Sequence, residues 1–459
     1  MREATKVAGS GASSRGTSSA YRVLRTIARS AVRTFYSTIE ATGLEHIDPT
    51  RPTIYAPTHP NSIIDPLLVG LFEDRPICFV ARDGLFRVPV FGAILRAVGA
   101  VPVARRKDHT GKVDNAAAFD ACRSALENGG VLVLFPEGKT HGRLRVEPLK
   151  TGLARIALTA PSDVRIIPIG LNYLVRHAFR SDVHVAFGAP IRPEGEPKEL
   201  TKTVQEALQQ LSVHVEKEDD ERLIAQVTAI VAEVRAKAGL DAAVTPAERV
   251  ALAQRVVDAY RWLERRDPER TAELRERITG LLEERAALGL GGERPALQHR
   301  GERRIAERWT EDPATLLLGA PLALWGIANH VPSYLALRAL LAVSPPSFYR
   351  GALLRLGGGL AIFGGFYAVQ TTAVAMVAPW AALPYFLSLA PSGLFARRYL
   401  AEIRLHRFGP RRFWRILKHR DRIAILKLDR EQLTRELAEL RTEYLASIPQ
   451  PSAPASTLN

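Results

Sequence analysis

The chain has 459 residues, which is too long for one ordinary domain and predicts two or three folded units. Its formal net charge of +15 implies an anionic partner, whether nucleic acid, anionic lipid or a phosphorylated substrate. The two cysteines are too few for a disulfide framework, and a reducing cytoplasmic location fits them.

The chain changes character at about residue 20. Residues 1–19 are rich in Ser, Gly and Thr, and we expect them to be disordered. Residues 20–39 alternate arginine with apolar side chains, which predicts a basic amphipathic helix. Two roles stay open for this helix: it lies on an anionic bilayer, or it caps the domain that follows.

Residues 40–200 alternate short apolar runs with helical stretches. The runs 52–56 and 131–135 are typical of buried strands, whereas 113–128 has helical spacing. This alternation predicts an α/β domain. Residues 201–312 are instead rich in Glu, Arg, Ala and Leu, and they predict a charged region of exposed helices, to which the sequence assigns no role.

Residues 313–397 are nearly uncharged and predict membrane-embedded helices. The section 358–378 contains 21 residues without a charge, enough to cross a hydrocarbon layer of about 30 Å. The continuation 379–395 predicts a second, shorter span or a re-entrant hairpin, and a buried helical core of a soluble protein is the alternative.

Basic residues follow the apolar region and indicate its orientation. Lys and Arg beside a membrane helix place that end in the cytoplasm. If the catalytic domain is also cytoplasmic, we expect an even number of spans, most simply two. The segment 398–447 predicts a basic amphipathic helix, and 448–459 a disordered tail. The expected location is the membrane, with the active site facing the cytoplasm.

A histidine and a carboxylate form the first candidate site. His59 follows an apolar strand and precedes Pro60, so it lies where a strand ends and a helix begins. A histidine can accept a proton near neutral pH, and Asp65 could fix its tautomer and stabilise the imidazolium. Positions six apart do not share a helix face, so the pair requires His59 to lie outside the helix. By itself the pair is weak evidence for catalysis, because most such pairs are an ordinary polar contact and a helix-surface acid.

Cationic residues and turns follow other predicted strands. Arg105 and Arg106 come after the run 99–103, where a guanidinium can bind phosphate oxygens or simply lie on the surface. The turn 135–138, with Lys139, can form a small anion-binding concavity. The run 166–170 predicts another buried strand.

Taken in order, four segments resemble the sequence blocks of the glycerolipid (phospholipid/glycerol) acyltransferase family: 59–65, 99–106, 134–141 and 167–170. The resemblance covers about residues 40–195. Five residues separate His59 from Asp65 where the common spacing is four, as in the fungal-type glycerol-3-phosphate/dihydroxyacetone-phosphate acyltransferases. The resemblance implies an α/β fold with a mixed sheet flanked by helices, followed here by a helical insert and a C-terminal membrane-helix region.

The resemblance also implies a reaction. An O-acyltransferase of phospholipid biosynthesis would move a fatty acyl group from acyl-CoA or acyl carrier protein to a hydroxyl of glycerol 3-phosphate or a related lysophospholipid. His59 would deprotonate that hydroxyl and Asp65 would orient His59. The residues expected to hold or shape the substrate pockets are Arg105, Arg106, Glu137, Gly138, Lys139 and Pro168. No metal or cofactor beyond the acyl donor is expected, and membrane lipids are the expected partners.

Three other classes of function were weighed. A lipid thioesterase or esterase could use the same base on water, although the sequence has no G-x-S-x-G nucleophile elbow. A non-enzymatic membrane lipid-binding adaptor would use the positive charge alone. Nucleic-acid binding is not expected, because the basic residues lie beside apolar segments without an RNA-binding aromatic signature or zinc-ligand spacing.

Overall fold

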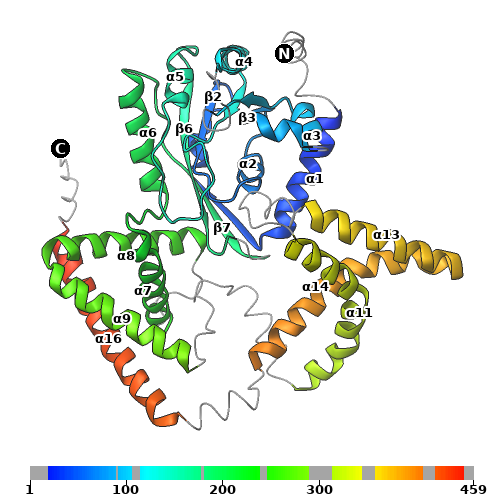
Figure 1. Ribbon diagram of the computed structural model, residues 1–459, viewed down its shortest axis with the longest axis vertical. Coiled ribbons are helices and arrows are strands. Elements are labelled where there is room, and N and C mark those ends of the chain that lie inside the picture. The colour runs from blue at the N-terminus through cyan, green and yellow to red at the C-terminus, as the bar shows by residue number, and fades with distance from the viewer. Residues whose placement is uncertain are drawn as a thin grey trace, which may run out of the picture. The chain divides into compact units, whose positions relative to one another are not determined.

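The computed structural model describes residues 19–88, 91–105, 114–176, 180–237, 245–288, 313–343, 357–406 and 419–448 (Figure 1). The chain divides into two compact units. The first comprises Met1–Ser212 and His299–Arg407, and the second Val213–Gln298 and Phe408–Asn459. Residues 1–18 and 449–459, which carry most of the two segments predicted to be disordered, lie outside the described residues.

A seven-stranded sheet forms the centre of the first unit, in the order β1-β7-β6-β2-β5-β3-β4. The strands are β1 (Thr38–Thr42), β2 (Thr53–Pro57), β3 (Ile77–Arg82), β4 (Val101–Val103), β5 (Val131–Val133), β6 (Arg165–Tyr173) and β7 (Asp182–Phe187). Neighbouring strands pair parallel, except that β6 and β7 pair antiparallel. The predicted α/β fold with a mixed sheet is therefore confirmed.

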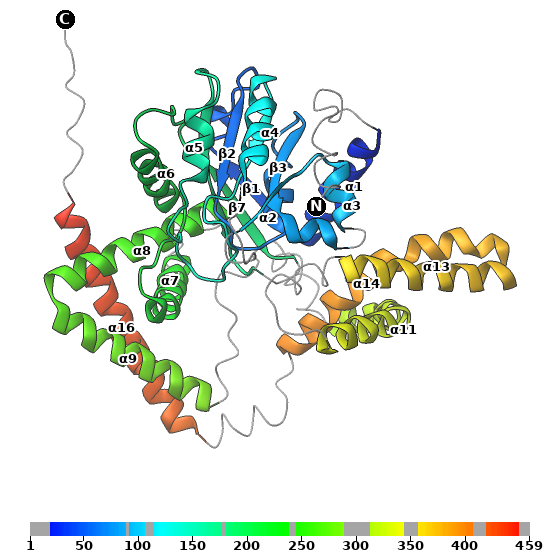
Figure 2. The ribbon, with the colours of Figure 1, turned by 45° about the horizontal axis from the view of Figure 1, so that its top comes forward.

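Helices cover both faces of the sheet (Figures 1 and 2). One face carries α4 (Ala116–Glu127), α5 (Gly152–Leu158) and α6 (Pro197–Leu211), and the other carries α1 (Ser19–Phe35) and α2 (Ile64–Val69). The short helices η3 (Leu44–His46), η4 (Asp83–Arg87) and α3 (Phe91–Ala97) lie in the connections. Side chains of a strand alternate between the two faces, so Ile54 packs with α4–α6 while Tyr55 packs with α2.

Two predicted boundaries of this domain are wrong. The first helix ends at Phe35 rather than at residue 39, because Thr38–Thr42 pair with β7 as a strand. The predicted boundary at residue 200 cuts through α6. Three residues spaced along α6 (Leu200, Val204 and Leu208) are buried in the sheet's core, so α6 belongs to the α/β domain.

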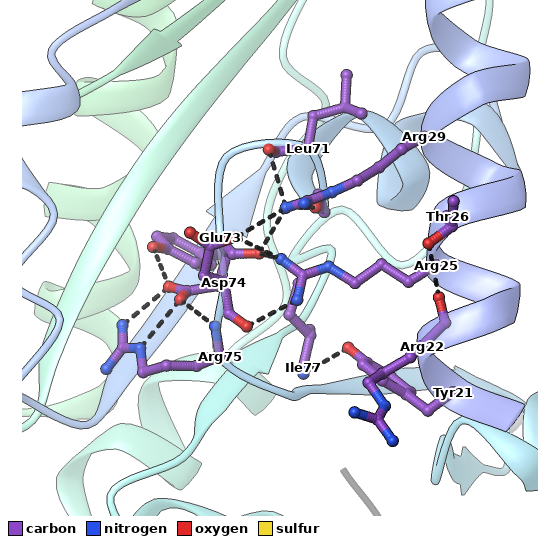
Figure 3. A network of polar contacts seen from close by, with 12 residues as sticks. Tyr21, Arg22, Arg25, Thr26, Arg29, Leu71, Glu73, Asp74, Arg75 and Ile77 are labelled. Atoms are coloured by element: carbon purple, nitrogen blue, oxygen red, sulfur yellow. Dashed lines mark hydrogen bonds and ion pairs between the residues drawn. The ribbon is translucent and has the colours of Figure 1, made fainter. Parts of the chain in front are cut away.

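The helix α1 caps this domain (Figure 3). Arg25 donates hydrogen bonds to the carbonyl oxygen and the Oδ1 atom of Asp74, both at 2.7 Å, and Arg29 donates to Asp74 Oδ1 at 3.0 Å. The opposite side of the helix exposes Val23 and Ile27. Capping is thus confirmed for the inner face, and bilayer binding would have to use the outer face.

Three apolar helices belong to the same unit by sequence: α11 (Pro313–Val343), α13 (Gly359–Val377) and α14 (Ala382–His406). They pack on one another, and the short turn η7 (Pro379–Ala381) joins α13 to α14. Among the described helices, α13 alone is long and apolar enough to cross a membrane. The predicted boundary at residue 397 is wrong, because α14 continues without a break to His406.

The second unit is a bundle of four described helices: α7 (Glu218–Lys237), α8 (Pro246–Arg266), α9 (Pro268–Ala287) and α16 (Arg420–Ser447). The final helix therefore begins at 420 rather than 398, with 407–418 outside the described residues. Leu433 and Leu440, seven residues apart on α16, join Leu223 and Ile278 in one apolar core. The charged region predicted as exposed helices thus has a core of its own, and the C-terminal helix completes it.

Candidate active site

The loop after β2 brings His59 and Asp65 together. The Nδ1 atom of His59 lies 2.8 Å from Oδ2 of Asp65. Because Nδ1–H donates to the carboxylate, the lone pair of the imidazole is on Nε2. The side chain of His59 is 17% exposed, whereas that of Asp65 is 0% exposed. The pair therefore combines a base that solvent can reach with a carboxylate that it cannot.

The loop conformation explains how a spacing of five residues permits this contact. The helix α2 begins at Ile64, so His59 lies outside it, as the sequence required. The backbone N–H of Asn61 donates to Asp65 Oδ2 at 2.7 Å. Ser62 has a φ of 52°, in the left-handed region that residues other than glycine seldom occupy. This one residue turns the chain so that the longer loop still closes.

A second strand completes the surroundings of Asp65. The hydroxyl of Tyr173, the last residue of β6, donates to Asp65 Oδ1 at 2.5 Å. Burial raises the pKa of Asp65, and hydrogen bonds from His59, Tyr173 and Asn61 oppose that rise. These hydrogen bonds stabilise the ionised carboxylate in the absence of water.

Glu137 fixes the backbone of the loop after β2. It is 1% exposed, and its Oε1 accepts a hydrogen bond from the backbone N–H of His59 at 2.9 Å. Its other oxygen, Oε2, accepts from the backbone N–H of Glu147 at 3.1 Å and contacts His141 Nε2. The carboxylate therefore connects the segment after β2 to the loop after β5, and it holds the backbone of His59 in place.

The ring of Phe135 forms one wall beside the base. It stacks on the imidazole of His59, with ring centroids 4.0 Å apart and an interplanar angle of 24°. A flat apolar surface against the ring limits how far the imidazole can rotate. The hydrogen bonds of His59 and this stacking together restrict where Nε2 points.

Basic side chains around the turn after β5 are held by one acid. Glu147 accepts from Lys139 Nζ at 2.8 Å and from Arg145 Nε at 2.8 Å. The hydrogen bond from Arg145 and the ammonium of Lys139 lower the pKa of Glu147 to about 2. Lys139 is thus already ion-paired, and an anionic substrate would compete with Glu147 for it.

Two arginines end strands at the same edge of the sheet. Arg82 is the last residue of β3, and Arg105 follows β4. Both strands run parallel to β2, so their carboxyl ends meet at the edge where His59 lies. Neighbouring strands are about 4.8 Å apart, which places the end of β4 roughly 14 Å from the end of β2. Asn115 holds the backbone of Ala104 by two hydrogen bonds of 3.0 Å.

Three predicted site residues remain to be placed: Gly138, Pro168 and Arg106. Gly138 has a φ of +64°, and the side chain of Lys150 lies 3.0 Å from where its Cβ would be, so both conformation and space favour glycine. Pro168 is buried inside β6, opposite Ala56, and the structure does not bring it to His59. Its predicted contact with the acyl donor stays a prediction. Arg106 lies outside the described residues.

Three residues of this edge were missed by the sequence reasoning: Tyr173, Glu147 and Arg82. Tyr173 ends the same motif that contains Pro168, and Arg82 ends an apolar run, which are signals that can be read from sequence. Glu147 had no such signal, because its partners come from an irregular loop. Within the described ranges, no group of three or more His, Cys, Asp or Glu side chains is placed to hold a metal ion.

The fold and the site together define a class. A histidine–carboxylate pair at the carboxyl edge of parallel strands, with one arginine at the end of β3 and another shortly after β4, suits proton removal from a hydroxyl near an anionic group. Residues 38–172 match the model of the Acyltransferase family. The match covers less than a third of the chain, and it confirms the resemblance drawn from the motifs of this segment.

Similar proteins carry related names. Glycerol-3-phosphate O-acyltransferase 1 of Saccharomyces cerevisiae is 37% identical over 97 residues, which are 20% of this chain and 12% of that protein. A chloroplast 1-acyl-sn-glycerol-3-phosphate acyltransferase of Arabidopsis thaliana is 28% identical over 167 residues, covering 34% of this chain and 44% of that protein. The chain thus spans 12–14% of its fungal relatives and less than half of its plant relatives.

A solved structure was also found. The 1-acyl-sn-glycerophosphate acyltransferase PlsC of Thermotoga maritima aligns with 46% of this chain and 82% of that chain, at 20% identity and a TM-score of 0.34.

Proposed function

We propose that this protein transfers a fatty acyl group from an acyl thioester to a hydroxyl of a phosphorylated glycerol acceptor. The observation that carries the proposal is the 2.8 Å contact between His59 Nδ1 and the buried Asp65, which leaves Nε2 available as a base. The acyltransferase domain of residues 38–172 supports the reaction class, and relatives named for glycerol 3-phosphate and 1-acylglycerol 3-phosphate support the acceptor class.

The chemistry follows from the pair. His59 Nε2 takes the proton of the acceptor hydroxyl as its oxygen attacks the thioester carbonyl carbon. The tetrahedral intermediate then expels the thiolate of CoA or acyl carrier protein, which receives the proton from His59. Asp65 stabilises the imidazolium formed between these two proton transfers. The products are an ester and a free thiol, and the base is regenerated.

Arginines would bind the acceptor's phosphate. Arg105 follows β4, the outermost of these parallel strands, and no described residue forms a hydrogen bond or ion pair with its guanidinium. A guanidinium binds phosphate through two parallel hydrogen bonds, which orients as well as attracts the substrate. We assign Arg105 the phosphate, with Lys139 available if the phosphate displaces it from Glu147.

Membrane attachment would place the site near a lipid product. The helix α13 has no buried residues, and Val377 at its end and Trp380 in the following turn η7 are 88% and 83% exposed. Such an apolar surface needs lipid around it. The segments before and after the apolar region fold together as the second unit, so both would lie on one side of the bilayer. We therefore propose an even number of crossings, with the catalytic domain in the cytoplasm.

The test is transfer from a labelled long-chain acyl-CoA by membranes containing the wild-type protein, His59→Ala or His46→Ala. His46 lies outside the site and contacts the carbonyl oxygen of Phe187, so it is a matched control. Glycerol 3-phosphate, dihydroxyacetone phosphate and lysophosphatidate are offered separately. We expect ester product with one acceptor, and a loss of about 10²-fold or more in His59→Ala alone.

Other outcomes separate the alternatives. Release of free fatty acid without any ester would overturn acyl transfer in favour of a thioesterase. Transfer that survives in His59→Ala would overturn the base assignment. If acyl-CoA yields nothing, the same assay with acyl carrier protein distinguishes a different donor from a lipid-binding adaptor.

A further inference from the structure

The hydroxyl of Tyr173 binds the same carboxylate that His59 contacts. Its donor oxygen lies 2.5 Å from Asp65 Oδ1, while His59 and the backbone of Asn61 share the other carboxylate oxygen, Oδ2. Tyr173 therefore serves one oxygen of Asp65 by itself. It is 108 residues away in sequence, and its position depends on the pairing of β6 with β2.

We propose that Tyr173 is a positioning residue for the acyl-transfer reaction, which holds the Asp65 carboxylate in the orientation and charge state that His59 needs. The inference rests on the proposed function for its kinetic consequence only. Its geometric content is a relay of three side chains, from Tyr173 at the end of β6 through Asp65 in the first turn of α2 to His59 in the loop after β2.

The physical reason is the burial of Asp65. A carboxylate without access to water depends on protein donors for its stabilisation, and three donors are present here. Tyr173 cannot easily lose its own proton, because burial raises the pKa of its hydroxyl. It therefore acts as a permanent donor over the working range of pH.

Removing this donor should shift the pH at which the base becomes protonated in a defined direction. The deprotonated pair, with a neutral imidazole and an ionised carboxylate, loses the most stabilisation, because the hydrogen bond to a full carboxylate charge is the strongest. The pair then holds an added proton more tightly. The pH at which the base becomes protonated should rise, and the freed carboxylate should orient His59 less well.

Another tyrosine provides a matched control. Tyr55 is 0% exposed, and its hydroxyl donates to Oε2 of Glu73 at 2.8 Å, so it too serves a buried carboxylate. Glu73 is held by Arg75 and does not contact His59. Tyr55→Phe therefore removes the same atom from the same kind of hydrogen bond, away from the base.

The first measurement is steady-state transfer as a function of pH. In Tyr173→Phe we expect kcat to fall about tenfold with both KM values within twofold, because substrates do not touch the hydroxyl. We expect the acid limb of the kcat/KM profile to move upward by about half a pH unit or more. Tyr55→Phe should keep the wild-type kcat and profile.

The second measurement does not depend on turnover. Diethyl pyrocarbonate modifies neutral imidazole, and mass spectrometry of the peptide containing His59 gives the rate of modification at each pH. The midpoint should shift upward in Tyr173→Phe and not in Tyr55→Phe. A shifted midpoint in a protein without acyl transfer would retain the relay and reject the proposed function.

The opposite results would overturn the relay. Wild-type kcat and midpoint in Tyr173→Phe would show that the hydroxyl is dispensable. Equal losses in Tyr173→Phe and Tyr55→Phe would show that both hydroxyls serve only folding. If Tyr173→Phe does not fold, a wild-type midpoint in Tyr173→Leu would reject the relay, since leucine carries no hydrogen-bond donor for Asp65.

Discussion

Two histidines of this protein, His59 and His330, each lie near a tyrosine, but the hydrogen-bond partners of their rings differ. His59 contacts Asp65 through Nδ1, and a tyrosine completes the cluster by binding that carboxylate. In the apolar helices, His330 contacts the carbonyl oxygen of Gly326 at 2.7 Å and the hydroxyl of Tyr367 at 2.8 Å. Among the described residues, Nε2 of His59 has no hydrogen-bond partner, whereas both ring nitrogens of His330 have one.

The difference lies in the carboxylate. The residues around His330 supply carbonyl and hydroxyl oxygens, and the neighbouring Asn329 binds the hydroxyl of Tyr385 at 2.6 Å. Neutral partners hold a histidine in place without stabilising an imidazolium, so this cluster joins helices rather than moving protons. A buried histidine with a tyrosine is therefore not enough for base catalysis, and the buried acid distinguishes the two.

The largest effect should come from removing the carboxylate charge. Asp65→Asn keeps the shape of the side chain but cannot stabilise an imidazolium, so we expect kcat to fall about 10²- to 10⁴-fold. His330→Ala should leave kcat within threefold, because its ring serves packing only. Both values come from the acyl-transfer assay. Equal losses in the two variants would remove the contrast drawn between the clusters.

A smaller effect on stability should separate two glycines of the apolar helices. A Cβ at Gly326 would lie 2.2 Å from the carbonyl oxygen of Ser392, whereas nothing lies within 4 Å of the corresponding point at Gly364. Gly326→Leu should therefore separate α11 from α14 and cost on the order of 1–3 kcal/mol, while Gly364→Leu should be neutral. The thermal unfolding midpoint of detergent-purified protein measures this. Identical midpoints would show that the close helix approach contributes nothing.

The smallest expected effect is on the stability of the fold at acidic pH. Glu147 has its pKa lowered from 4.5 to about 2 by Arg145 and Lys139. Its stabilisation is present above pH 4.5 and is lost as the pH falls toward about 2, because the unfolded chain binds the proton first. Glu147→Gln should flatten the pH dependence of unfolding in this window. No carboxylate occurs in 313–343 or 357–396, so those helices should not contribute. An unchanged slope in the variant would exclude Glu147 as the acid-sensitive group.

Much of the fold was predictable because strands and apolar helices depend on patterns of neighbouring residues. Apolar runs predicted β2, β5 and β6, and the uncharged stretch predicted α13. The boundary at residue 200 failed for a physical reason. Polar and charged residues together dominate α6, and the burial of its narrow apolar stripe (Leu200, Val204 and Leu208) becomes evident only when the sheet that covers it is known.

The candidate site was predictable in part. His59 and Asp65 lie six positions apart, one more than the common spacing, and their contact depends on a loop in which Ser62 adopts the left-handed region. Glu137 was predicted as a pocket residue, and the structure shows its carboxylate beneath the backbone of His59. The motif pointed to the right residue, whereas its function as a clamp depends on the register of β2 and β5.

The sequence by itself determined which chemical groups this protein has and which segments can become strands, apolar helices or charged helices, because those properties depend on neighbouring residues. Only the tertiary structure decided which groups meet. Glu137 reaches His59 across 78 positions and Tyr173 reaches Asp65 across 108. Such contacts follow from strand order and register, which arise from packing the whole sheet and cannot be read from any one segment.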